Sequence, residues 1–441
     1  MIDMNRFNKG LPKTFGLYTL GCKVNQYETQ LIREKLFNAG LKEPQAEMAD
    51  IYVVNTCTVT HKADKESWRL VRRLHRRNPS ARIFVTGCSA ENRPESFRAI
   101  EGVSRAVGNN QKEHLIDFIL PHLGQAGSQA AKNSITEFQK HTRAFLKIQD
   151  GCNNGCSYCI VPKVRGSSRS RPLNLIEKEA QDLVSRGYKE IVLCGICLGA
   201  YGRDLKPRLS LVRVIETLEK IKGLLRIRLS SIEASDIDSA LIDKMTNSGK
   251  LCRHLHIPFQ SGDDKILKLM NRKLKSGDYL KLLCRIRRAS PDIAITTDIM
   301  AGFPQEDEKS FNNTIKFLKK AKPSRMHIFH FSPRRNTAAF NLRIIPDGEV
   351  VKKRAGELKR VSKELACEFY KKFIGKSVSV LVESEIDLEA GLYKGYSGNY
   401  IKVYLSSKRD IRNNLVKAKI LRSYRDGVLA SGYSQVALSH K

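Results

Sequence analysis

The stretch Cys152-Asn-Asn-Gly-Cys156-Ser-Tyr-Cys159 decides how this 441-residue chain is interpreted. Its three cysteines are separated by three and then two residues, so one loop can carry all of them. A structural zinc site needs four ligands, commonly from paired C-x-x-C units, and no second pair or suitable histidine run follows. A disulfide would leave one cysteine over. Three thiolates at this spacing fit a loop wrapped around one corner of an iron–sulfur cubane, whose fourth iron then has no protein ligand.

The sequence around this loop predicts alternating strands and helices. Amphipathic stretches such as 175–186 and 211–220 are expected to be helices, and short apolar runs between them are expected to be strands. Repeated strand–helix units in this number favour an α/β fold, a partial or full (β/α) barrel over about residues 136–368. The strand candidates are 144–148, 190–193, 226–229, 254–257, 293–298 and 326–331.

The region before it, residues 14–124, also alternates strands and helices and predicts an open parallel sheet. Cys22, Cys57 and Cys88 each follow a predicted strand (15–20, 51–54 and 83–86). Open α/β sheets bind their ligands at the carboxyl ends of the strands. The three cysteines are therefore either a second cluster site at one sheet edge or three ordinary buried thiols.

The last region, residues 371–437, reads as a small five-stranded β-barrel. Residues 371–441 hold 13 Lys and Arg against 6 Asp and Glu. Such a basic barrel is typical of a nucleic-acid grip, although a solvated charged surface has the same composition. Its predicted strands are 377–383, 391–395, 400–404, 415–420 and 428–433, and residues 125–133 are expected to be a linker further upstream.

The charge of the whole chain indicates a polyanionic partner. Lys and Arg total 78 against 45 Asp and Glu, a formal net charge of +33, which favours RNA or DNA. An anionic membrane is the less favoured partner because no basic amphipathic anchor stands apart. The segment 1–15 lacks the apolar core of a signal peptide, and eleven cysteines without one argue against a disulfide framework. We expect a cytoplasmic protein with no membrane contact.

A basic helix is expected over 62–77. Its cationic residues fall on one face together with Trp68, while Leu70, Val71 and Leu74 are expected to pack inward. This face could contact phosphates, or it could be a merely solvated helix. The cationic residues are Lys65, Arg69, Arg72, Arg73, Arg76 and Arg77.

The central triplet, with Tyr158 before its third cysteine, resembles the radical S-adenosylmethionine superfamily. The resemblance implies that S-adenosylmethionine chelates the open iron of a [4Fe-4S] cluster held by Cys152, Cys156 and Cys159, and that its cleavage yields a 5′-deoxyadenosyl radical. Flanking motifs resemble the methylthiotransferase family more narrowly. They are Ala144-Phe-Leu-Lys-Ile-Gln-Asp-Gly-Cys152, Ile160-Val-Pro-Lys-Val-Arg-Gly166, Arg226-Ile-Arg-Leu-Ser-Ser-Ile-Glu233, His254-Leu-His-Ile-Pro-Phe-Gln-Ser-Gly262 and Thr297-Asp-Ile-Met-Ala-Gly-Phe-Pro304.

This resemblance also implies a cofactor pocket. Tyr158, Gly195, Glu233, Gln260 and Asp298 are expected to line the S-adenosylmethionine site, and no catalytic side chain beyond the cluster ligands is expected. For the polar members the alternative is capping or hydrogen bonding at strand ends. One departure lies close by: the family tends to carry a polar residue at Cys197, so a pocket contact there is lost or replaced.

Three motifs bring the first cysteine trio into the same family. Thr19-Leu-Gly-Cys22-Lys-Val-Asn-Gln-Tyr-Glu28, Asn55-Thr-Cys57-Thr-Val59 and Thr86-Gly-Cys88 resemble the signatures of the methylthiotransferase N-terminal domain, and the last region resembles the TRAM RNA-binding module. The resemblance implies a second [4Fe-4S] cluster on Cys22, Cys57 and Cys88 that carries the sulfur. Both open irons must then serve one substrate, because one iron cannot both cleave the sulfonium and present sulfur.

Within the family, the string around Cys22 is most similar to the branch that adds a methylthio group to C2 of N6-threonylcarbamoyladenosine at tRNA position 37. The alternatives are isopentenyladenosine tRNA, an aspartate of a ribosomal protein or, in another class, a non-catalytic iron–sulfur RNA-binding protein. The implied partners are tRNA and a flavodoxin- or ferredoxin-like electron donor; the sulfur donor is not indicated.

Overall fold

The computed structural model describes residues 12–44, 48–121, 134–138 and 141–435. The chain divides into two compact units, one of residues 1–135 with 160–166 and one of 136–159 with 167–441. The expected linker at 125–133 lies outside the described residues. The second unit contains both regions that the sequence analysis separated at about residue 370.

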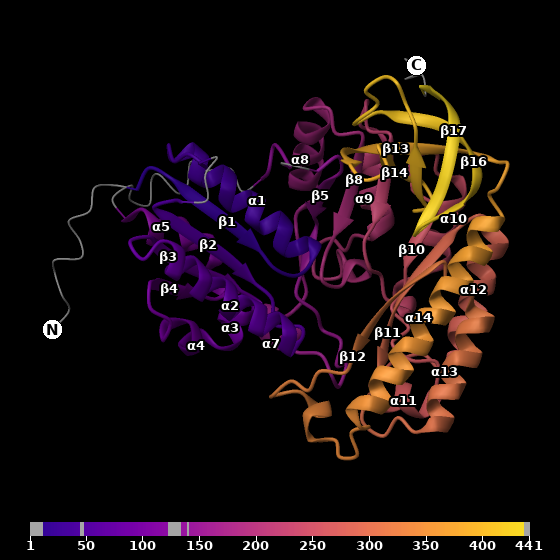
Figure 1. Ribbon diagram of the computed structural model, residues 1–441, viewed down its shortest axis with the longest axis horizontal. Helices are drawn as coiled ribbons and strands as arrows, with labels where there is room; N and C mark the ends of the chain where they lie inside the picture. The colour runs from indigo at the N-terminus through magenta and orange to yellow at the C-terminus, as the bar shows by residue number, and fades with distance from the viewer. Residues whose placement is uncertain (1–11, 45–47, 122–133, 139–140, 436–441) are drawn as a thin grey trace. The chain divides into compact units, whose positions relative to one another are not determined.

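The first unit is a parallel sheet in the order β1-β2-β3-β4, covered by helices on both faces (Figure 1). The central strand β2 is buried along its whole length, as expected for a strand with helices on both sides. One apolar cluster joins α1 and α5 to the sheet, and another joins α2, α3 and α4 to it. The bounds are β1 Phe15–Thr19, α1 Lys23–Asn38, β2 Ile51–Thr56, α2 His61–Arg77, β3 Arg82–Gly87, α3 Cys88–Asn92, α4 Pro94–Arg98, β4 Val103–Val107, η2 Asn109–His114 and α5 Leu115–Ile119.

A short helix that follows the central triplet in sequence belongs to this first unit. Helix α7 (Val161–Arg165) begins two residues after Cys159. Ile160 and Val164 pack against the side chain of Cys88. In the sequence this segment lies inside the region expected over 136–368, while its contacts are with the first unit.

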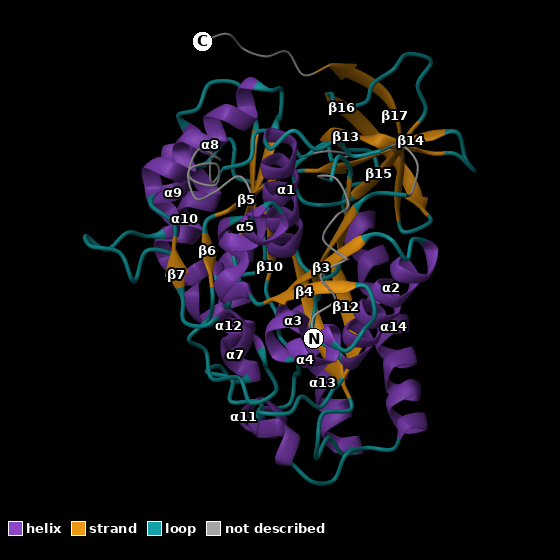
Figure 2. Ribbon diagram, turned by 90° about the vertical axis from the view of Figure 1, so that its left-hand side faces the viewer, coloured by secondary structure: helices purple, strands orange, loops and turns teal. Residues whose placement is uncertain are grey.

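The second unit contains two three-stranded parallel sheets, β5-β8-β9 and β10-β11-β12. Single bridges from Ile227 to Leu251 and from Ser231 to His256 connect the two sheets. Its large core includes the inner faces of helices α8 to α10 and α12 to α14, and Figure 2 shows the helices and strands of this unit by colour. The bounds are β5 Ala144–Lys147, β6 Gln149–Asp150, β7 Arg169–Ser170, α8 Leu173–Ser185, β8 Glu190–Cys194, η4 Leu198–Ala200, α9 Leu211–Glu219, β9 Arg226–Leu229, η5 Ala234–Asp236, α10 Ser239–Asn247, β10 His254–His256, α11 Asp264–Leu269, α12 Ser276–Ala289, β11 Ala294–Ala301, α13 Glu308–Ala321, β12 Arg325–His330, η6 Ala338–Asn341 and α14 Gly348–Lys371.

The end of the second unit is a closed five-stranded barrel in the order β13-β14-β15-β17-β16. Closure leaves none of these strands with an unpaired edge. Arg226 and Arg228 of β9 donate to main-chain oxygens of the barrel, including Tyr396 O at 3.0 Å and Ser397 O at 3.1 Å. The bounds are β13 Ser377–Asp387, β14 Leu392–Ser397, β15 Lys402–Leu405, β16 Leu415–Tyr424 and β17 Gly427–Gln435.

Among the described residues, no helix combines the length and apolar character required to cross a bilayer.

Candidate active site

The loop that carries Cys152, Cys156 and Cys159 is held in place by main-chain hydrogen bonds. Ser157 N donates to Met270 O at 3.0 Å, and Ala339 N donates to Ser157 O at 2.7 Å. The side chain of Asn271 donates to Gly155 O at 2.7 Å. Contacts of the protein itself therefore fix the course of the loop.

Nitrogen and sulfur groups surround the sulfur atoms of this loop. Cys156 Sγ lies 3.7 Å from Arg272 Nη1, and Cys152 Sγ accepts from Asn154 N at 3.3 Å. A hydrogen bond from the Cys197 thiol lowers the pKa of Cys152. Such donors stabilise thiolates, the form of cysteine that binds iron. Cys197, where the family tends to carry a polar residue, thus contacts the first cysteine of the loop directly.

Arg272 connects this loop to Glu233. Its Nη1 and Nη2 donate to the two Glu233 carboxylate oxygens at 2.9 and 2.6 Å, a bidentate pair. Nη2 also donates to Pro258 O at 2.9 Å. Glu233 is one of the predicted pocket residues, whereas Arg272 was not predicted, because it lies three residues past α11 in no recognised motif.

A cavity of about 120 Å³ opens beside these groups. Its polar lining places an anionic side chain and two cationic side chains next to Cys156. The lining residues are Asn154, Gly155, Cys156, Glu233, Ser235, Asn271, Arg272, Lys273, Leu274 and Tyr279.

Gly195 occupies a position that has no room for a side chain. A Cβ there would lie 2.8 Å from Oε1 of Gln149, whose side chain also accepts from Cys197 N at 2.8 Å. The same Gln149 amide donates to Gly151 O at 2.8 Å, just before Cys152. Gly195 therefore leaves room for the Gln149 side chain, which holds Gly151 at the start of the cysteine loop.

Gln260 has a strained backbone and an unsatisfied side chain. Its φ is +67°, a value that costs free energy for a residue other than glycine. Its Oε1 is buried without a hydrogen-bond partner among the described residues. Its main-chain N donates to Asp298 O at 2.8 Å, which places the two predicted pocket residues side by side. A buried acceptor in this state is an expected feature of a site that a polar ligand completes.

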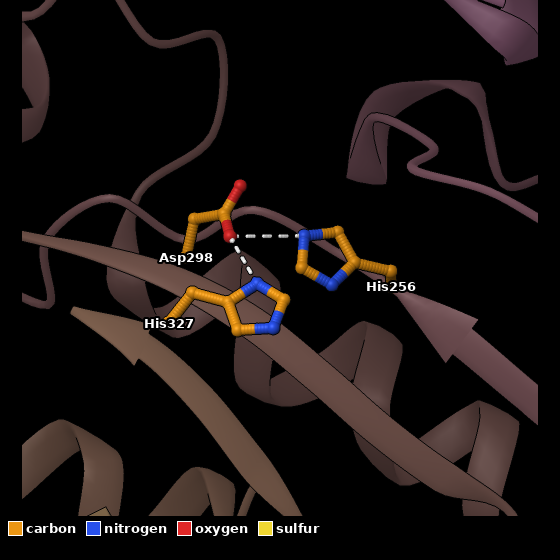
Figure 3. A group of neighbouring side chains, drawn as sticks. All are labelled: His256, Asp298 and His327. Carbon is orange, nitrogen blue, oxygen red and sulfur yellow. Dashed lines mark hydrogen bonds and ion pairs between the residues drawn. The ribbon is translucent and has the colours of Figure 1, made fainter. Parts of the chain in front are cut away.

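The Asp298 carboxylate lies between two histidine rings. His256 Nε2 and His327 Nδ1 are each 3.1 Å from its Oδ1 (Figure 3). Burial alone would raise the pKa of Asp298, but hydrogen bonds from these two histidines outweigh it and hold the pKa well below its usual range. Tyr158, the remaining predicted pocket residue, is partly buried with its ring edge-on to Phe303 at 6.5 Å.

Together these residues fit the cofactor that the family implies. Three cysteines on one ordered loop can hold a cluster, and the ionic pair Glu233–Arg272 and the open acceptor of Gln260 lie on the same unit. The charged pair and the Gln260 oxygen can form polar contacts with the amino, carboxylate and hydroxyl groups of S-adenosylmethionine.

The cysteines of the first trio lie at the carboxyl ends of three adjacent strands. Cys22 caps α1 after β1, Cys57 follows β2 directly, and Cys88 opens α3 after β3. A Cβ on Gly21 would lie 3.0 Å from Cys57 Sγ, so glycine, with φ +102°, allows the first two turns to approach each other. The structure thus brings the trio to one edge of the sheet, as the strand pattern predicts.

Arg165 of α7 completes this edge. Its Nε donates to Cys88 Sγ at 3.3 Å, and its Nη2 donates to Asn25 Oδ1. Its Nη1 donates to Glu28 Oε1 at 2.8 Å, and Lys112 forms an ion pair with the other oxygen of the same carboxylate. Arg165 is 1% exposed, so these contacts are made away from water.

The chemistry of this edge fits an iron–sulfur cluster. Burial raises the pKa of the Cys57 thiol to about 12, so metal binding, rather than pH alone, would form its thiolate. Arg165 and Lys112 bring two positive charges against the single carboxylate of Glu28, which leaves an excess positive charge beside Cys88. That charge would offset the negative charge of a thiolate-bound cluster.

Comparison with known proteins shows the family. The radical SAM superfamily matches residues 146–318, and the uncharacterized protein family UPF0004 matches residues 14–108. The threonylcarbamoyladenosine tRNA methylthiotransferase MtaB of Bacillus subtilis is 38% identical over 94% of this chain and 96% of that protein. The protein of the same name from Thermotoga maritima is 37% identical over 84% of this chain and 87% of its own length. A tRNA-2-methylthio-N(6)-dimethylallyladenosine synthase of Thermodesulfovibrio yellowstonii is 36% identical over 83% and 87%.

The chain therefore belongs to the radical S-adenosylmethionine methylthiotransferases, whose members use a [4Fe-4S] cluster and S-adenosylmethionine. Among solved structures, the radical S-adenosylmethionine methyltransferase TsrM from Kitasatospora setae shares the fold, with a TM-score of 0.54 at 12% identity over 85% of this chain and 79% of that chain.

Proposed function

We propose that the protein transfers a methylthio group to C2 of N6-threonylcarbamoyladenosine next to the anticodon of tRNA, in the cytoplasm. The observation that carries this proposal is the identity of 34–38% with relatives that are named for this reaction and are matched over 83–94% of this chain. The net charge of +33 suits a tRNA substrate. We take the closed C-terminal barrel as a TRAM-like RNA-binding domain and the two parallel sheets of the second unit as a partial radical SAM barrel.

Cys152, Cys156 and Cys159 hold the radical-forming cluster in this proposal. Tyr158, Gly195, Glu233, Gln260 and Asp298 line the cofactor pocket, where bound S-adenosylmethionine supplies the 5′-deoxyadenosyl radical. Support comes from the fixed loop, the Glu233–Arg272 pair beside Cys156 and the open Oε1 of Gln260.

Cys22, Cys57 and Cys88 hold a second [4Fe-4S] cluster that carries the sulfur. Its support is their shared place at one sheet edge and the positive charge of Arg165 beside Cys88. Two clusters divide the work in this proposal, because one iron cannot both cleave the sulfonium and present the sulfur. A small flavodoxin- or ferredoxin-like protein would supply the electrons.

The two trios have separable roles, and this is the basis of the test. Anaerobically reconstituted Cys22→Ala should still form 5′-deoxyadenosine but yield no methylthiolated nucleoside, whereas Cys156→Ala should do neither. Mass spectrometry of nucleosides from tRNA, with and without the threonylcarbamoyl group, reports the product. Two results would contradict the proposed substrate. One is that the enzyme methylthiolates only isopentenyladenosine, and the other is that wild-type enzyme with its full iron content leaves the threonylcarbamoyl tRNA unmethylthiolated.

A further inference from the structure

Three strands of the second unit bring two imidazoles and one carboxylate to a single point. His256 lies on β10, Asp298 on β11 and His327 on β12. Asp298 and His327 are directly paired in the parallel register of their strands, and His256 pairs with Thr296. Figure 3 shows both rings pointing at one carboxylate oxygen. The positions of the three side chains are therefore set by the sheet and not by a mobile loop.

Two of the three distances between these atoms are close to the edges of a small coordination shell. His256 Nε2 and His327 Nδ1 are both 3.1 Å from Asp298 Oδ1, and the three ligand atoms lie within 4.8 Å of one another. Ligands about 2.1 Å from a zinc ion are roughly 3–3.5 Å from each other in a tetrahedral site. Two histidines and one carboxylate are also a common protein ligand set for zinc with an open fourth position.

The second nitrogen of His256 has the partner that a metal-binding histidine needs. Its Nδ1 is 2.9 Å from Thr296 Oγ1, which in turn is 3.0 Å from His254 Nε2. With a cation bound, the Nδ1 proton would be donated to the threonine hydroxyl, and Nε2, no longer donating to Asp298, would present its lone pair to the ion. This outer contact fixes both the orientation and the tautomer of the ring.

The site is open on one side. The side chain of His327 is 54% exposed, whereas those of His256 and Asp298 are 12% and 24% exposed. An ion can therefore enter past His327, and water or an oxygen of a substrate can occupy the fourth position. The other nitrogen of His327, Nε2, can keep its proton in solvent while Nδ1 binds the ion.

We propose that His256 Nε2, Asp298 Oδ1 and His327 Nδ1 form a binding site for one divalent cation of the zinc type, separate from both cysteine trios. Ligation through Oδ1 leaves Oδ2 of Asp298 for any contact with the cofactor, so the proposal does not depend on the roles assigned above. A redox-inert ion at this place would not interfere with the reduced iron that the family's chemistry requires.

Zinc binding to the reconstituted holoenzyme tests the proposal directly. We expect one zinc per chain in addition to the cluster iron after exposure to Zn²⁺ and desalting. Zinc K-edge absorption should show only nitrogen and oxygen ligands, with two imidazoles. His327→Ala should weaken zinc binding at least tenfold. The matched control is His330→Ala, which removes another exposed imidazole of β12 and should leave zinc binding unchanged.

Three results would overturn the proposal. The first is that the wild type, reconstituted with its clusters, binds no zinc. The second is that the zinc edge shows sulfur ligands, which would place the ion on a cysteine trio. The third is that His327→Ala and the wild type bind zinc with equal affinity. Iron and sulfide contents and 5′-deoxyadenosine formation, measured on the same samples, report on the proposed function separately. The absorption measurement uses only the wild type, so a poorly folded variant does not remove the test.

Discussion

At the scale of single residues, the guanidinium of Arg165 donates both to the Glu28 carboxylate and to the Cys88 thiol. Arg165→Gln would leave Glu28 buried with Lys112 as its one remaining cationic partner among the contacts described, and would remove the donor to Cys88. Breaking such a buried pair costs roughly 2–4 kcal/mol. We expect a lower thermal midpoint for the first unit and a lower iron content, measured by scanning calorimetry and iron analysis of the reconstituted chain.

Lys163→Gln is the matched control. It removes the same charge two residues earlier on α7, at an exposed side chain. Its thermal midpoint and iron content should stay near those of the wild type. If both variants lose stability equally, the effect belongs to net charge and the buried contacts of Arg165 are not its cause.

The cysteines could be selected from the sequence, but their partners could not. The triplet 152–159 is recognised from the spacing of its cysteines, and Cys22, Cys57 and Cys88 from their positions at predicted strand ends. Both patterns extend over only a few neighbouring residues, so the sequence alone shows them. Arg165 and Glu28 are 137 positions apart and meet only through the tertiary fold. His327 likewise becomes a candidate ligand only when β12 pairs with β11.

At the scale of elements, β9 and the C-terminal barrel meet around one buried carboxylate. Burial alone would raise the pKa of Glu190, but the Arg228 guanidinium outweighs it, with help from Arg143 and Arg226, and lowers the pKa. Arg228 Nε donates to Glu190 Oε1 at 2.6 Å. Arg226 and Arg228 also donate to main-chain oxygens of β14, so this charge cluster joins β9 to the barrel.

This network predicts a pH dependence of stability. A carboxylate with a lowered folded pKa contributes stability that is complete above its unfolded value, about 4.3, and is lost as the pH falls below it. The wild type should be more stable than Glu190→Gln at pH 7, by about 3–5 kcal/mol. Thermal unfolding from pH 7 to pH 3 should show this difference shrinking below about pH 4. A constant difference across that range would contradict the ionic role of Glu190.

Most elements could be predicted from periodicity, and the exceptions have physical reasons. The strand expected at 226–229 has those bounds in the structure, because arginine and aliphatic residues alternate along it and Ile227 and Leu229 both enter the core. Strand β4 was not expected, since Ser104 and Arg105 are exposed and interrupt its apolar pattern. Strands β6 and β7 are two residues long, too short for any periodic signal.

At the scale of the whole molecule, the excess positive charge would attract a tRNA before any specific contact forms. Helix α2 packs inward through Leu70, Val71 and Leu74, as the sequence pattern predicts. Its cationic side chains are all exposed: Lys65, Arg69, Arg72, Arg73, Arg76 and Arg77. Thr60 caps the helix by accepting from Ala63 N, which stabilises the start of the helix that carries this basic face.

If side chains of this basic face contact phosphates, removing them should change the salt dependence of tRNA binding. Each phosphate contact adds roughly 1 to the slope of log affinity against log salt, because a counterion is released. The double variant Arg72→Gln with Arg76→Gln should lower that slope by about 2 if both side chains contact phosphates. Fluorescence anisotropy of labelled tRNA over a range of KCl concentrations measures it.

The matched control removes the same charge elsewhere. Lys359 and Lys363 are exposed on α14, spaced by four residues as Arg72 and Arg76 are, so Lys359→Gln with Lys363→Gln has an equal net charge. If α2 contacts RNA, this control should weaken binding only through the long-range field and leave the slope nearly unchanged. Equal slopes in the two double variants would mean that tRNA responds to total charge, and α2 would then be a solvated helix.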